Sequence, residues 1–106
     1  MKYYAVAEMD IVDRAWVKPY VETVTALVER FGGRYLARTS KVEKLEGERA
    51  VPQVALLVEW PSREAAMAFY ESEEYRPFRD TRLAGARNEL ALVAGEDVAG
   101  AARIPE

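Results

Sequence analysis

Four charged side chains in otherwise apolar segments are the main candidates for chemistry. Glu8 and Glu59 each follow a run of apolar residues, and Arg34 and Arg38 bracket another. On one face of a sheet, either guanidinium could bind a carboxylate, enolate or phenolate, while Glu59 or Glu8, with a pKa raised by burial, moves a proton. Such a site would suit an isomerase, cyclase or lyase that needs no cofactor. The four could instead form an ion network that fixes strand register, and we favour this structural interpretation.

Three further polar residues lie on predicted helices and could contact a ligand. Tyr20 and Tyr75 could bring hydroxyl groups to the mouth of a cavity, and Arg82 could reach it from the last helix. Amphipathic side chains also commonly cover apolar surface while their polar tips stay in water. A structural role at the rim of the cavity is therefore an equal alternative for all three residues.

The composition excludes several familiar kinds of active site. Among 106 residues there is no cysteine and no histidine, which rules out thiolate nucleophiles, serine–histidine triads and zinc–thiolate sites. Haem ligation by histidine is excluded as well. We expect no cofactor and no obligatory metal.

Charge and hydropathy limit the partners that we expect. Fifteen Lys and Arg against 18 Asp and Glu leave a net charge of −3, so no basic field attracts nucleic acid or an anionic membrane. Glu8 comes too early for the apolar core of a signal peptide, and no apolar run approaches the ~20 residues of a membrane span. We therefore expect a soluble, cytoplasmic protein that binds neither nucleic acid nor membrane.

The apolar periodicity divides the chain into strands and helices around one core. Between residues 17 and 31 the apolar positions repeat at intervals of three and four, and Gly32 and Gly33 follow as a helix stop. Ser62 is placed to cap a second helix, and Pro77 suits the first turn of a third. We predict strands over 3–10, 34–39, 53–60 and 88–94, and helices over 17–31, 63–71 and about 75–86.

This order, β-α-β-β-α-β with the second connecting helix broken in two, predicts an α+β ferredoxin-like fold. It consists of a four-stranded, mainly antiparallel sheet with helices on one face. We assign residues 1–95 to this domain and 96–106 to a C-terminal tail. Because two strands are apolar on both faces, the open face of the sheet would expose a large apolar surface to water. We therefore expect two copies to pack sheet to sheet as a homodimer.

Strand parity predicts which side chains share the open face. Tyr4, Val6 and Glu8 alternate with residues that face the helices, and Glu59 joins them from the neighbouring strand. The same count adds Arg34, Leu36 and Arg38, which would complete a charged cavity between the paired sheets. A register slip of one residue would reverse any such assignment.

Several short segments resemble one known family. They are Gly32-Gly33-Arg34-Tyr35-Leu36, Leu45-Glu46-Gly47, Val58-Glu59-Trp60-Pro61-Ser62 and Tyr70-Glu71-Ser72-Glu73-Glu74-Tyr75. Their order and spacing resemble those of the family called domain of unknown function 1330, and the resemblance covers residues 1–95. The resemblance implies a ferredoxin-like dimeric α/β barrel and carries no settled reaction. Trp60 stands where the family pattern has Phe, which keeps an aromatic anchor.

Two classes of function follow from these observations. In the first, the homodimer binds a small organic acid or aromatic metabolite in its barrel cavity, with or without turnover. In the second, it is a noncatalytic ligand-binding or interaction module whose barrel is filled by its own side chains. Cavity size separates them, because a cavity well below the ~300 Å³ of ordinary ligand sites would count against catalysis.

Overall fold

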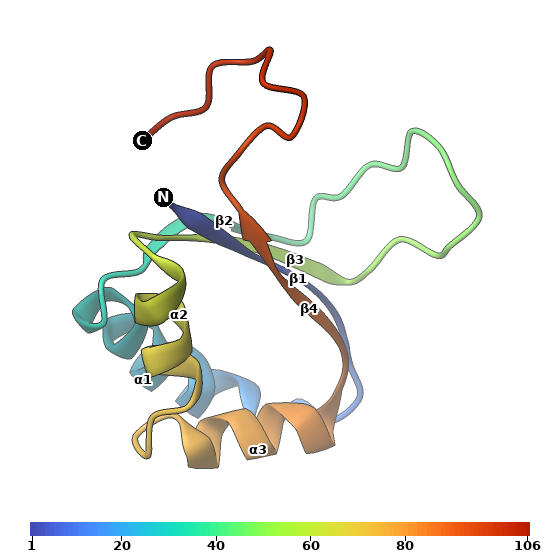
Figure 1. The fold of residues 1–106 in the computed structure, drawn as a ribbon. Helices are drawn as coiled ribbons and strands as arrows, with labels where there is room; N and C mark the ends of the chain where they lie inside the picture. Colours follow the sequence, from blue (N-terminus) through green and yellow to red (C-terminus); the bar gives the residue numbers. More distant parts are fainter.

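A four-stranded sheet with three helices on one face makes up the protein (Figure 1). The computed structural model describes all residues, 1–106. In chain order the elements are β1 (Tyr3–Ile11), α1 (Val17–Arg30), β2 (Arg34–Thr39), β3 (Val54–Trp60), α2 (Arg63–Tyr70), α3 (Arg76–Gly85) and β4 (Ala86–Ala94). The predicted ferredoxin-like fold is confirmed. None of the three helices combines the length and the apolarity needed to cross a membrane.

The strands are ordered β2-β3-β1-β4, and every neighbouring pair is antiparallel. In the centre of the sheet Val6 faces Leu57 on β3 and Ala91 on β4, while the next residue, Ala7, faces Leu56 and Leu90. Side chains alternate between the two faces of a strand. One set of residues therefore lies beneath the helices and the other forms the open face.

Local side-chain contacts explain where the helices begin and end. Ser62 caps α2 by accepting a hydrogen bond from the backbone N–H of Ala65 at 3.1 Å. The hydroxyl of Ser72 accepts from the N–H of Tyr75 at 3.2 Å, which separates α2 from α3. After α1 the chain turns through Gly32, whose φ of +101° is strained for residues with a side chain.

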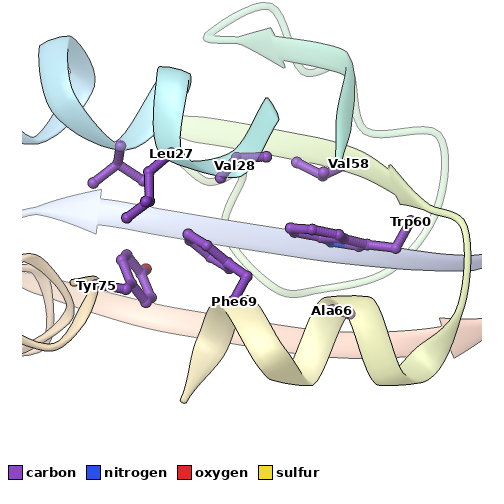
Figure 2. Close-up of a cluster of buried hydrophobic side chains, with 8 residues drawn as sticks. Leu27, Val28, Val58, Trp60, Ala66, Phe69 and Tyr75 are labelled. Atoms are coloured by element: carbon purple, nitrogen blue, oxygen red, sulfur yellow. The ribbon is translucent and has the colours of Figure 1, made fainter. Parts of the chain in front are cut away.

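The core lies between the helices and the sheet (Figure 2). Trp60 on β3 stacks on Phe69 of α2 with ring centroids 5.4 Å apart. The centroid of the Phe69 ring lies 4.2 Å from that of the Tyr75 ring. Gly33 is buried against this cluster, because an added Cβ there would lie 2.6 Å from a methyl group of Val28 and 2.9 Å from the Trp60 ring. Aromatic packing thus joins α2 and the start of α3 to the centre of the sheet.

A β-bulge in β2 changes the predicted distribution of side chains. Tyr35 faces Val58 and Ala37 faces Leu57, so Leu36 is an extra residue without a partner on β3. The side chains beyond it are shifted by one position, and Arg38 pairs with Leu56 on the helix side. The prediction that Arg38 shares a face with Glu59 is therefore wrong, whereas Arg34, which precedes the bulge, does pair with Glu59.

No helix covers the open face of the sheet (Figure 1). Its central apolar side chains are exposed: Val6 by 36%, Leu57 by 40% and Val93 by 47%. Charged groups lie at both ends of β1: Glu59 is paired with Lys2 at 3.3 Å and with Arg34 at 3.1 Å, and Glu8 with Arg49 at 3.4 Å. The open face is thus an apolar centre with a polar border.

The chain after β4 contains no helix or strand, but it is locally organised. The Asp97 carboxylate accepts hydrogen bonds from the backbone N–H groups of Ala99, Ala101 and Ala102, at 2.9, 2.9 and 2.7 Å. These bonds lower the pKa of Asp97, with that from Ala102 contributing most. Val98 at the tip of this turn is almost fully exposed.

Candidate binding cavity

A cavity of about 590 Å³ lies between the helices and the sheet, not on the open face. Of its 26 lining residues, 23 are hydrophobic, and they come from all four strands and all three helices. The sheet contributes Ala5, Ala7, Leu56, Val58 and Leu92, which alternate with open-face residues. The apolar character of this floor follows from the strand pattern in the sequence.

One wall of the cavity is polar. The hydroxyl groups of Tyr20 and Tyr75 share a hydrogen bond of 2.6 Å. Arg82 donates from Nε to the Tyr75 hydroxyl at 3.3 Å and from Nη1 to Oδ1 of Asn88 at 2.8 Å. Asn88 is itself held by bonds from Nδ2 to the carbonyl oxygens of Arg82 and Ala86. Residues from α1, α3 and β4 thus form one connected network.

Arg82 is the unusual member of this network. Its exposed fraction is only 4%, and its Nη2 atom is buried without any hydrogen-bond partner. Burial lowers the pKa of the guanidinium, but Tyr75 and Tyr20 outweigh that effect and shift the pKa upward overall. The side chain therefore remains a cation. A buried charged donor without a partner is costly, and an acceptor oxygen of a ligand would satisfy it.

Two tyrosines of the cavity, Tyr20 and Tyr35, have raised pKa values. Burial, followed by the neighbouring Tyr75, raises the pKa of Tyr20 far above the ordinary value for a phenol. Burial also raises the pKa of Tyr35, against the opposing effect of Arg38. Neither hydroxyl ionises near pH 7, so neither supplies a base there.

Every charged residue that lines the cavity is an arginine: Arg14, Arg38 and Arg82. Arg38 lies over the Tyr35 ring, 4.6 Å from its centroid, and donates to the Thr25 hydroxyl at 3.0 Å. No Asp or Glu lines the cavity, although acidic residues outnumber basic ones in the chain. No group of three or more His, Cys, Asp or Glu side chains is arranged to hold a metal. The cavity is thus an apolar, positively charged site.

The structure divides the predicted site residues into two groups. Tyr20, Tyr75, Arg82 and Arg38 meet at the cavity. Arg34, Glu8 and Glu59 do not line it: Arg34 pairs with Glu59, and Glu8 pairs with Arg49 of the β2–β3 loop at 3.4 Å. Catalysis by the two carboxylates stays a prediction. Both carboxylates are held in ion pairs, as in the alternative interpretation of an ion network, but Arg38 is not one of the partners.

Sequence reasoning missed Asn88 and Thr25, which orient Arg82 and Arg38. Asn88 faces Met9 on β1 and so lies on the helix side of β4. A polar residue at the start of an otherwise apolar strand face was the available signal. Thr25 had no comparable signal, since it lies between Val24 and Ala26 in an otherwise regular helical pattern.

The sequence matches the family model described as "Domain of unknown function (DUF1330)" over residues 2–96, and the chain belongs to this family. The resemblance read from the short segments is thereby confirmed. No curated protein matches the sequence significantly.

Several solved structures share the fold. A protein of unknown function from Rhodopseudomonas palustris is 17% identical, with a TM-score of 0.74 over 87% of this chain and 80% of that one. SnoaB, a cofactor-independent oxygenase from Streptomyces nogalater, is 13% identical, with a TM-score of 0.62 over 93% of this chain and 97% of that one. An antibiotic biosynthesis monooxygenase is 18% identical, with a TM-score of 0.59 over 92% of this chain and 100% of that one. At these identities the likeness establishes a common fold and not a common activity.

Proposed function

We propose that this protein binds a small organic acid with an aromatic or other compact apolar body in the cavity beneath its helices. The observation that carries the proposal is the buried Arg82 guanidinium at the wall of an otherwise apolar cavity, where its Nη2 atom has no hydrogen-bond partner. The volume of about 590 Å³ lies within the range of ordinary ligand sites, which favours ligand binding in this cavity beneath the helices. The ligand's acidic group would bind at Arg82.

The lining favours binding of a preformed anion over a reaction that begins with proton removal. General base catalysis requires an acceptor within reach of the substrate proton, and neither a carboxylate nor an imidazole lines the cavity. The tyrosine hydroxyls and Arg82 are donors, which suit a carboxylate, phenolate or enolate oxygen. Among the reaction types predicted from the sequence, those that need an enzymatic base thus have the weakest support from this site.

We also propose that two copies pair through the open faces of their sheets. The exposed centre formed by Val6, Leu57 and Val93 is bordered by charged pairs, an arrangement typical of interfaces with an apolar core and a polar rim. A specific interface of this kind buries about 800 Å² on each partner. The cavity lies on the other side of each sheet, so each subunit would keep its own ligand site.

Calorimetric titration with 4-methylbenzoate and 4-methylbenzamide tests the binding proposal. The two probes have the same shape, but only the acid is charged. We expect the acid to bind about tenfold more tightly, because a hydrogen bond to a charged partner contributes about 1.5–3 kcal/mol. The variant Arg82→Gln should lose this preference while retaining weak binding of both probes.

The exposed Arg63 at the start of α2 supplies the matched control, since it does not line the cavity. Arg63→Gln removes the same charge and should bind both probes as the unmodified protein does. An equal affinity of the unmodified protein for acid and amide, or a preference that survives Arg82→Gln, would contradict the proposal.

A further inference from the structure

The cavity holds more positive charge than one acidic group requires. Five arginines elsewhere in the chain, such as Arg30 and Arg76, pair with carboxylates. The three arginines that line the cavity, Arg14, Arg38 and Arg82, have no carboxylate partner, and of these Arg38 and Arg82 are held in place by hydrogen bonds. Building on the proposed function, we propose that the ligand is a diacid, with one acidic group bound by Arg82 and the second by Arg38.

The Arg82 position is suited to an acidic group that is removed from water. Two of its guanidinium nitrogens are used by Tyr75 and Asn88, which hold the plane of the group in one orientation. Only Nη2 remains free, and it is buried. The tyrosine pair lies beside the same guanidinium, and one of its two hydroxyl hydrogens, which the hydrogen bond within the pair does not use, can donate to an anion.

Arg38 reaches the cavity only because of the bulge at Leu36. In a regular register Arg38 would pair with Ala55 and lie on the open face, the face that carries Leu57 and Glu59. Bulges are frequent beside active sites, where they redirect a side chain. Here the redirected guanidinium is held by the Thr25 hydroxyl and the Tyr35 ring, neither of which neutralises its charge. Arg38 remains exposed and therefore suits the outer end of a ligand.

The spacing of the two positions limits the shape of the ligand. Tyr20 marks the Arg82 end and Thr25 marks the Arg38 end, and both residues belong to α1. Five residues correspond to about 7.5 Å along a helix axis and about 140° around it, so the two positions are at least that far apart. Between them the wall is apolar, with Val21 and Val24 from α1 and Leu56 from the sheet. The geometry thus suits a rigid, ring-sized apolar body with acidic groups at opposite ends.

Titration with terephthalate and 4-methylbenzoate tests this inference. The probes share a para-substituted ring, and they differ in having a second carboxylate or a methyl group. We expect terephthalate to bind about tenfold more tightly, in line with the contribution of one charge-assisted hydrogen bond. In the variant Arg38→Gln this advantage should disappear, so that terephthalate and 4-methylbenzoate bind with similar affinity.

Arg14→Gln and Arg63→Gln are the control variants. Arg14 lines the cavity but has no bond to the polar wall, and Arg63 lies outside it. Both variants should keep the preference for the diacid. Loss of that preference in Arg14→Gln but not in Arg38→Gln would overturn the assignment of Arg38.

The outcomes for the unmodified protein separate the two proposals. If 4-methylbenzoate binds and terephthalate binds no more tightly, the diacid inference fails and the binding function stands. If neither probe binds at millimolar concentration, the proposed function fails and the inference fails with it.

Discussion

Replacing Tyr75 with Phe is the sharpest test of how much the linked hydrogen bonds of the polar wall stabilise the fold. The change keeps the ring that contacts Phe69 at 4.2 Å and removes only the hydroxyl. That hydroxyl bonds to the Tyr20 hydroxyl at 2.6 Å and accepts from Arg82 Nε at 3.3 Å. Two polar groups in a largely buried region would therefore lose a partner in one step.

The expected loss of stability follows from this count. A buried polar group left without a partner costs about 1–3 kcal/mol. The bond from Arg82 is long, so we place the total for Tyr75→Phe at about 2 kcal/mol. For a domain of this size the Tm should fall by roughly 10 °C. Tyr20→Phe should cost about half as much, because Tyr75 keeps its bond to Arg82.

Urea unfolding followed by tryptophan fluorescence measures these differences in the free energy of unfolding. All variants are compared at one protein concentration, because dimer formation would make stability depend on concentration. The double variant Tyr20→Phe/Tyr75→Phe is the decisive comparison. It removes both hydroxyls, so no Tyr20 hydroxyl remains to be left without a partner, and it should be at least as stable as Tyr75→Phe. Additive losses, or a larger loss for Tyr20→Phe than for Tyr75→Phe, would refute the reasoning.

Three further predictions concern other parts of the molecule. Gly85→Ala should destabilise the fold by about 1–3 kcal/mol, the usual effect of overpacking. The added Cβ would lie 2.3 Å from the Trp16 ring, and urea unfolding together with a shift in tryptophan emission would report the displaced indole. Leu57→Glu places a charge at the apolar centre of the open face and should convert the proposed dimer to monomers, as read by light scattering. A variant that stays dimeric would place the interface elsewhere. The lowered pKa of Asp97 predicts that its turn is intact above the ordinary pKa of aspartate and is lost as the pH falls through the lower folded value. Amide NMR shifts of Ala102 during acid titration should therefore change at a pH below that at which an unstructured aspartate titrates, and a midpoint at the ordinary value would contradict this.

The order of elements and the buried faces of the strands could be predicted from the sequence because their causes are local. The spacing of apolar residues in α1, the cap at Ser62 and the break at Ser72 each depend on a few neighbouring residues. The alternation along β1 likewise identified the residues beneath the helices. These local patterns were sufficient to predict the ferredoxin-like fold and the apolar open face.

The location and charge of the cavity were decided by tertiary structure. The bulge at Leu36 exists only relative to β3, and a count along β2 alone assigns Arg38 to the wrong face. Tyr20, Tyr75, Arg82 and Asn88 are spread over 69 positions of the chain, from 20 to 88, and meet only when α1, α3 and β4 pack together. The sequence by itself therefore determined which segments form the layers. How those layers pack determined that the carboxylates remain outside the cavity and that Arg82 is buried with one guanidinium nitrogen, Nη2, lacking a hydrogen-bond partner.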